Sequence, residues 1–295
     1  QQTPIRGPVA YWNLDEASGT RADSAGSNPL TDHGVTSATG KISNAGQFVR
    51  ASSTFLACSV GAGNVLQLGS GVNFTVCCWV YLDSKPADMA IACQWDGGGT
   101  RAWLLYYRSA TDSFRFDVYD GTTVATADAA IVPSTGAWYF IAAWRDSGST
   151  NLQINNGAIV TLGTSIYAQS STDTFGIGSH SGAAFYNGRI DEVGFWRVAL
   201  TGGERTAIYN SGTGLAMSSF APATIYVATS HLIGGGVGSL GAELLEPLTL
   251  ERRAEVENCR APQSTLTFRL RDIDQAATDI VSAGIAGYQC RFYAG

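Results

Sequence analysis

The sequence predicts an all-β sandwich followed by a small β-rich appendage, and three observations lead to this prediction. Only 14% of the 295 residues are charged and 35 are glycine, whereas globular domains average about 25% charged residues. From Val9 to Gly214, short apolar runs alternate with clusters of Gly, Ser, Asn and Asp, which is the pattern of sandwich strands and their turns. The composition changes after Phe220, so we expect a second unit there.

Ten apolar runs in the first unit are expected to be strands. The run Phe74–Leu82 has apolar residues on both faces, which is typical of a central strand covered on each side. In the run 113–121, Arg115, Asp117 and Tyr119 share one face, so this strand is expected to be half-buried with a wet outer face. In order, the runs are 9–14, 46–51, 74–82, 89–95, 102–107, 113–121, 137–145, 151–160, 173–178 and 189–196.

One helix is expected after the last of these strands. Thr201 is a capping residue and Glu204 follows three residues later, as in a capping box. Ala207 and Ile208 supply an apolar contact, and Gly212 is expected to end the segment. A short helix after a long series of strands fits a sandwich closed by a helical turn.

Residues 221–295 form the expected appendage, with a boundary near residues 218–224, so that the first domain is residues 1–220. Runs at 248–258, 264–272 and 287–295 resemble strands. About 75 residues is a size at which a lone hydrophobic core is marginal. We therefore expect this unit to self-associate or to attach to other proteins of an assembly.

Composition excludes several classes of protein. The net charge is −6 with no basic run, so a nucleic-acid-binding surface is not expected. No apolar run reaches the roughly 20 residues of a membrane-spanning helix. The chain begins with Gln1, which fits either a removed leader or a fragment. We expect an extracellular protein or one on the surface of a virion.

The six cysteines do not indicate a metal site, because there is no CxxC pair and no histidine at zinc-finger spacing. The adjacent Cys77 and Cys78 are expected to point to opposite faces of one strand as small buried residues. Disulfide pairing is left open, with Cys259 and Cys290 as the favoured pair because both lie in the appendage.

A series of segments resembles a known family. "AYWNLDEASGT", "NFTVCCWVYL", "AWYFIAAWRDSGSTNLQINNG", "DTFGIGS" and "YNGRIDEVGFWRVALTGGERTAIYNSG" follow one another in order. They resemble the laminin-G-like branch of the concanavalin A-like lectin/glucanase superfamily over about residues 9–215. The resemblance implies a two-sheet antiparallel jelly roll. Arg189 departs from it, because the family often has a small or apolar residue there. No family is recognised for residues 221–295.

Because the superfamily includes glycoside hydrolases, the resemblance raises the question of whether two carboxylates of this chain have catalytic spacing. A retaining glycosidase needs two carboxyl groups about 5–5.5 Å apart. The adjacent Asp191 and Glu192 point to opposite faces if the strand is regular. The series Glu251, Glu255 and Glu257 lies beside two arginines and no tryptophan, so it is expected to be a solvated strand face. No catalytic residue is therefore predicted, and a hydrolase is a remote alternative.

The resemblance also implies a structural calcium ion. Asp191 from the last strand would supply a carboxylate, with Asp15 or backbone carbonyls from the N-terminal strand as further ligands, since calcium prefers six to eight oxygens. The alternative is that Asp191 caps the turn after Asn187–Gly188. Glu192 is expected to anchor a neighbouring loop by accepting hydrogen bonds.

Carbohydrate binding is the predicted function. Sugars stack on flat aromatic rings while polar groups contact their hydroxyls. The segment "QWDGGGTR" is the most loop-like polar insertion, and its neighbourhood supplies the candidate ligand-binding residues Trp95, Asp96, Arg101, Trp103 and Tyr107. The alternative is a purely structural virion protein, such as a phage capsid decoration or tail fibre protein, in which the jelly roll serves as a spacer.

Overall fold

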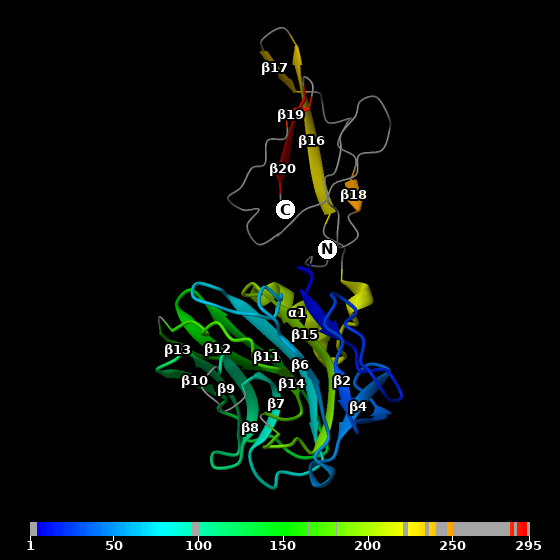
Figure 1. The fold of residues 1–295 in the computed structure, drawn as a ribbon, viewed down its shortest axis with the longest axis vertical. Helices are drawn as coiled ribbons and strands as arrows, with labels where there is room; N and C mark the ends of the chain where they lie inside the picture. Colours follow the sequence, from blue (N-terminus) through cyan, green and yellow to red (C-terminus); the bar gives the residue numbers. More distant parts are fainter. Residues whose placement is uncertain are drawn as a thin grey trace. The chain divides into compact units, whose positions relative to one another are not determined.

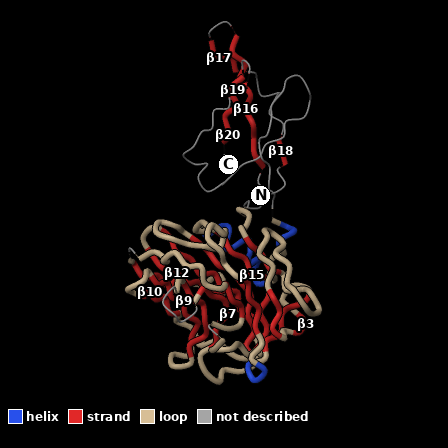
Figure 2. Tube along the Cα trace, viewed as in Figure 1, coloured by secondary structure: helices blue, strands red, loops and turns tan. Residues whose placement is uncertain are grey.

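The computed structural model describes residues 5–95, 101–164, 166–180 and 182–220, and the strands between residues 224 and 293. The chain divides into two compact units, Gln1–Phe220 and Ala221–Gly295. Figure 1 shows the first unit as two stacked layers of strands, and Figure 2 shows that loops and strands make up nearly all of it.

The first unit is a sandwich of two antiparallel sheets. The eight-stranded sheet has the order β13 (Ile159–Gly163), β12 (Ser149–Ile154), β11 (Trp138–Asp146), β6 (Phe74–Leu82), β15 (Gly188–Trp196), β4 (Asn44–Phe48) and β3 (Thr36–Thr39), and β1 (Ala10–Trp12) also pairs with β15. The seven-stranded sheet has the order β10 (Val124–Asp128), β9 (Ser113–Tyr119), β8 (Trp103–Arg108), β7 (Met89–Gln94), β14 (Phe175–Ile177), β5 (Phe55–Cys58) and β2 (Thr31–His33). The predicted two-sheet antiparallel sandwich is confirmed.

The main core lies between the two sheets. Strand alternation sends one side chain in two to this interior, and the aromatic rings of Phe74, Trp103, Phe175 and Phe195 meet there at centroid distances of 5.8 to 6.3 Å. Each of these rings is fully buried, and burying one large apolar side chain contributes about 1.5–3 kcal/mol. The core therefore fixes which face of each strand is left for function.

A second apolar cluster lies on the outer face of the eight-stranded sheet, under the helix α1 (Gly202–Tyr209). Tyr209 stacks on Trp79 of β6, with ring centroids 5.9 Å apart. Ile208 is also buried in this cluster. We call this surface the covered face. As predicted, Cys77 belongs to this cluster and Cys78 to the main core.

The helix begins as the sequence predicts. Thr201 is its N-cap, and Thr201 and Glu204 form both hydrogen bonds of a capping box. The helix ends earlier than expected, because Asn210 takes the left-handed conformation with φ of 48°. Gly212, with φ of 86°, lies in the short turn that follows.

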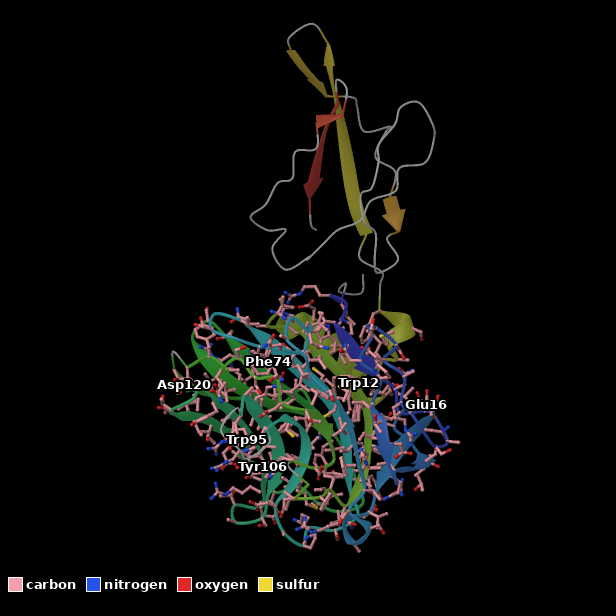
Figure 3. The ribbon with its side chains drawn as sticks, in the orientation of Figure 1. Trp12, Glu16, Phe74, Trp95, Tyr106 and Asp120 are labelled. Carbon is pink, nitrogen blue, oxygen red and sulfur yellow. The ribbon has the colours of Figure 1, made fainter. Side chains whose placement is uncertain are left out.

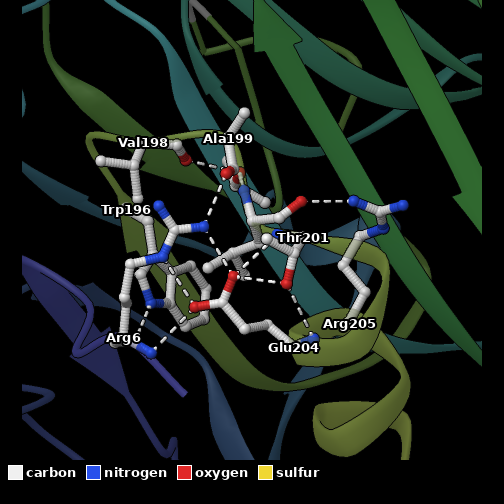
Figure 4. Close-up of polar contacts among 9 residues, drawn as sticks. Arg6, Trp196, Val198, Ala199, Thr201, Glu204 and Arg205 are labelled. Atoms are coloured by element: carbon white, nitrogen blue, oxygen red, sulfur yellow. Dashed lines mark hydrogen bonds and ion pairs between the residues drawn. The ribbon is translucent and has the colours of Figure 1, made fainter. Parts of the chain in front are cut away.

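An ion pair holds the N-terminal segment against this helix (Figure 4). Arg6 donates from Nε to Glu204 Oε1 at 2.7 Å and from Nη2 to Oε2 at 2.6 Å, while Trp196 Nε1 donates to the Arg6 carbonyl at 2.7 Å. Burial raises the pKa of Glu204, but hydrogen bonds from Arg6 and Thr201 outweigh it and lower that pKa to about 2. The pair thus closes the covered face.

The run 151–160, expected to be one strand, is a hairpin instead. It is divided between β12 and β13, with Asn155 and Asn156 at φ of 51° and 55° in the turn. Consecutive positive φ values are typical of a two-residue type I′ turn, which favours Asn and Gly. The sequence "NNG" therefore marked a turn that the apolar pattern concealed.

In the second unit, the described strands form an antiparallel five-stranded sheet. Its order is β17 (Gly236–Ser239), β16 (Thr224–Ile233), β20 (Tyr288–Tyr293) and β19 (Gly284–Ile285), and β18 (Pro247–Thr249) also pairs with β16. Strand β20 agrees with the run predicted at 287–295. The run at 264–272, most of the run at 248–258 and the Cys259–Cys290 pairing lie outside the described residues.

In the part of the chain that the structure describes, Cys58, Cys77, Cys78 and Cys93 are free thiols, and burial raises the pKa of each. In the same part of the chain, no helix has the length and apolar character required to span a membrane.

Candidate functional site

A β-bulge in β15 places Asp191 and Glu192 on the same side of the sheet. The pairing of β15 with β6 shifts between Asp191 and Gly194, and Glu192 has φ of 51°. A bulge inserts one extra residue and redirects a side chain. Asp191 pairs with Trp79, and Glu192 contacts Tyr11, both of which belong to the covered face. The expectation that these carboxylates point to opposite faces is therefore wrong, because the strand is not regular.

Asp191 caps the turn between β3 and β4. Its Oδ2 accepts hydrogen bonds from the backbone N–H of Lys41 at 2.8 Å and of Ile42 at 3.0 Å. Burial and the neighbouring charge of Glu192 together raise the pKa of Asp191 to about 8, against the lowering effect of the two amides. The expected turn after Asn187–Gly188 is thus not the one that Asp191 caps.

Glu192 and Asp15 hold other parts of the same region. Glu192 accepts a hydrogen bond from the Tyr11 hydroxyl of β1, rather than from the loop or arginine expected. Burial raises the pKa of Glu192 to about 7. Asp15 Oδ1 accepts from the backbone N–H of Asn44 at 2.9 Å. These bonds attach β1 and the β3–β4 hairpin to β15, so the acid pair has a structural role here.

The acid pair is closed to a polysaccharide but retains one free acceptor. Asp191 is 0% exposed and Glu192 is 5% exposed. The buried Asp191 Oδ1 has no hydrogen-bond partner, and a bound cation would satisfy it. Within the described residues, no three His, Cys, Asp or Glu side chains are grouped as a metal site. A calcium ion here would therefore take most of its ligands from backbone carbonyls and water.

The outer face of the seven-stranded sheet carries a polar network that no helix among the described residues covers. Arg115 of β9 donates from Nη2 to Asp128 Oδ2 at 2.9 Å and from Nη1 to the Tyr106 hydroxyl at 3.4 Å. Thr126 donates to Asp117 Oδ1 at 2.6 Å, and burial raises the pKa of Asp117. The network thus presents donors and acceptors that strand alternation directs away from the core.

Aromatic rings flank this network. The Arg101 guanidinium lies 5.2 Å from the ring centroid of Trp95 and 4.8 Å from that of Tyr119, and the two rings are 6.0 Å apart. Trp95 packs against a small apolar cluster that includes Tyr106, and Figure 3 shows these two labelled side chains close together. We call the surface formed by Trp95, Arg101, Tyr106, Arg115, Asp117 and Tyr119 the open face.

Two of the predicted ligand residues face the wrong way. Trp103 is 0% exposed and Tyr107 is 2% exposed, because their positions on β8 point into the main core. Neither side chain is accessible to a ligand, which corrects the prediction for both. Trp95 and Arg101 are brought together as the sequence suggested, while Asp96 lies outside the described residues.

The sequence reasoning missed Tyr106 and the role of β9. Tyr106 alternates with the buried Trp103–Leu105–Tyr107 set and therefore faces outward. The sequence does predict a solvent-facing side for the strand at 113–121, made by Arg115, Asp117 and Tyr119. The solvent-facing side of this strand was therefore the sequence signal for the site, because a ligand can contact a sheet only on a face that solvent reaches.

Comparisons with known proteins give the family. A laminin G model described as "Concanavalin A-like lectin/glucanases superfamily" matches residues 57–204, half of the chain. The chain therefore belongs to this superfamily, as the resemblance indicated. No curated protein matches the sequence.

Solved structures share the fold at low identity. Domain 4 of AbnA, a GH43 extracellular arabinanase from Geobacillus stearothermophilus, in complex with arabinotriose, has 16% identity and a TM-score of 0.54, covering 70% of this chain and 98% of that one. The binding domain of Paraclostridial Mosquitocidal Protein 1 has 11% identity and a TM-score of 0.58, covering 90% and 74%. The receptor binding domain of botulinum neurotoxin mosaic serotype C/D has 13% identity and a TM-score of 0.55, covering 69% and 50%.

Proposed function

We propose that the first unit is a non-catalytic, extracellular carbohydrate-binding domain that contacts glycans with its open face. The superfamily is lectin-like, and similar folds occur in the binding domains of toxins and in a domain whose solved structure contains arabinotriose. These likenesses support a binding role. The choice of the open face rests on the geometry of its side chains.

The arrangement of Trp95, Arg101 and Tyr119 is the observation that carries this proposal. The Arg101 guanidinium and the two rings pack against one another, with separations of 4.8, 5.2 and 6.0 Å, so little side-chain freedom remains to be lost on binding. Aromatic faces suit the apolar faces of sugars. The neighbouring Arg115, whose side chain is 18% exposed, supplies donors for hydroxyl groups, while the buried Asp117 holds the Thr126 and Tyr106 hydroxyls beside it.

A hydrolytic role lacks support in the site. Asp191 and Glu192 are sealed under the covered face. On the open face, Asp117 is hydrogen-bonded to Thr126, and Asp128 is paired with Arg115. A glycosidase needs one carboxyl as acid and another as nucleophile or base, both facing the substrate. We therefore propose binding without cleavage.

Glycan-array binding tests this function. Trp95→Ala and Tyr119→Ala are each expected to weaken the array signal about fivefold or more, since each removes a stacking face. Tyr167→Ala is the matched control, because that half-buried ring stacks on Arg145 elsewhere. Array binding that survives both open-face substitutions, or that Tyr167→Ala abolishes equally, would contradict the proposal.

A structural calcium ion at Asp191 is proposed as a second feature of the unit. The buried, unpartnered Asp191 Oδ1 supports it. Added calcium is then expected to raise the melting temperature, a chelator to reverse this, and Asp191→Asn to abolish the response. An unchanged melting temperature in saturating calcium would reject this site. The structural virion role and self-association through residues 221–295 stay predictions.

A further inference from the structure

A row of side chains crosses the eight-stranded sheet just beyond the helix. Strand register places Trp138 of β11 opposite Tyr81 of β6, Tyr81 opposite Arg189 of β15, and Arg189 opposite Gln47 of β4. The covered face buries Trp79, the next residue of β6 on this side. The four side chains of the row are instead half-buried, so each of them remains partly accessible to solvent. We call these four residues the aromatic stripe.

Contacts within the stripe align its planar groups. Trp138 and Tyr81 have ring centroids 5.5 Å apart, and the Arg189 guanidinium lies 4.5 Å from the Tyr81 ring centroid. Arg189 Nε donates to Gln47 Oε1 at 3.3 Å. Adjacent strands are about 4.8 Å apart, so the stripe spans about 14 Å from Trp138 to Gln47. It can therefore receive an extended ligand rather than a single small group.

The stripe contains one cation, Arg189, and a second cation, Lys41, lies next to it, although the chain carries a net charge of −6. Lys41 Nζ lies 4.6 Å from the ring centroid of Trp79, the neighbour of Tyr81 on the same side of β6. In the described part of the chain, neither Lys41 nor Arg189 forms an ion pair. One carboxylate, that of Asp83, lies at the Gln47 end of the stripe, where it accepts a hydrogen bond from Gln47 Nε2 at 2.8 Å. Two cations held on aromatic rings thus lack a carboxylate partner.

We propose that the aromatic stripe is a second binding site, for an acidic polysaccharide. Trp138 and Tyr81 supply stacking surfaces for sugar rings. The planar Arg189 guanidinium donates to Gln47 from Nε and to the Thr39 carbonyl from Nη1, and its remaining N–H groups suit a carboxylate. A neutral glycan would leave that cation unpaired, and a small anion would leave the rings unused. The site lies on the opposite sheet from the open face and does not depend on the function proposed there.

Titration of the full-length protein with oligogalacturonate tests this site, with a neutral galacto-oligosaccharide of equal length beside it. Arg189→Gln and Trp138→Ala are each expected to weaken binding of the acidic probe roughly tenfold or more, since a hydrogen-bonded charge is lost in one and a stacking ring in the other. Arg197→Gln removes the same charge elsewhere and is expected to leave binding unchanged. Unchanged thermal unfolding of each variant excludes misfolding as the cause.

Several results would overturn the proposal. The first is that oligogalacturonate does not bind. The second is that Arg189→Gln and Arg197→Gln weaken its binding equally, and the third is that Trp138→Ala leaves its binding unchanged. Dextran sulfate that binds as tightly, with dependence on Arg189 but not on Trp138, would show charge attraction alone and also contradict the site. Trp95→Ala is expected to leave the acidic probe bound, so failure of the open-face function and failure of the stripe give different results.

Discussion

The covered face and the open face of the sandwich are made by the same strand alternation but are used differently. On the covered face, outward residues such as Trp79 and Trp144 are buried under α1 and the N-terminal segment. On the open face, outward residues such as Arg115 and Tyr119 remain partly exposed and interact with each other. The difference teaches that a segment added on top of a sheet, rather than the strands themselves, decides which face stays available to a ligand.

The two faces also treat carboxylates differently. Glu204 on the covered face has an arginine partner, and its pKa is lowered to about 2. Asp117 on the open face has hydroxyl partners from Thr126 and Tyr106, and burial raises its pKa. The hydrogen-bonded Arg6 and Thr201 therefore outweigh burial at Glu204, whereas the hydroxyl bonds and the charge of Arg115 do not outweigh burial at Asp117.

The largest expected effect is on the covered face. Trp79→Ala removes a ring that is 3% exposed and stacks on Tyr209, so it is expected to lower the free energy of unfolding by about 3–5 kcal/mol. Tyr119→Ala on the open face is expected to cost less than about 1 kcal/mol. Denaturant unfolding of both variants measures this, and equal losses would remove the distinction between the faces.

A smaller loss is expected from Glu204→Gln. The amide keeps an acceptor for Thr201 and Arg6 but loses the charge that strengthens these bonds. Because Arg6 is 46% exposed, solvent screens the pair, and the expected cost is about 1–3 kcal/mol. Arg6→Gln should cost a similar amount, and a double variant that costs the sum of both would show that the two side chains do not interact.

Low pH is expected to destabilise the first unit by protonating Glu204. Its pKa falls from an ordinary value of 4.5 to about 2 on folding, so its stabilisation is present above pH 4.5 and is lost as the pH falls toward 2. The free energy of unfolding of the native chain should decline over this window. Glu204→Gln should flatten the decline, and a variant with the native acid profile would show that other carboxylates control it.

The smallest expected effect is on the open face. The Arg115–Asp128 pair has side chains 18% and 29% exposed, and such pairs contribute about 0.2–1 kcal/mol. Asp128→Asn should therefore change the free energy of unfolding by less than about 1 kcal/mol. A loss as large as that of Glu204→Gln would mean that the open face is a structural surface.

Much of the fold was predictable because it follows from local rules. The alternation in Phe74–Leu82 and the capping box at Thr201 and Glu204 specify a central strand and a helix start through short-range physics. The β12–β13 hairpin was missed because the apolar residues on both sides of Asn155–Asn156 were taken as one run. The polar sequence Asn155–Asn156–Gly157 marks the turn, and the left-handed conformation of both asparagines lets the chain reverse there.

The site was only partly predictable, since it depends on strand register. Trp95 and Arg101 are close in sequence and were found. Trp103 was misassigned because one residue of register decides between the core and the open face. The bulge at Glu192 could not be read from the sequence, because Asp191–Glu192 looks the same in a regular strand. Its positive φ accompanies the register shift between β15 and β6, which are far apart in the sequence.

Amide hydrogen exchange in the presence of the neutral oligosaccharide that binds best on the array tests the central claim most directly. The account predicts that the glycan slows exchange in the segments around Arg101–Tyr106 and Arg115–Tyr119, with α1 and the β3–β4 hairpin unchanged. Protection confined to α1, or none on β8 and β9 under saturating glycan, would contradict the assignment of the open face as the ligand surface.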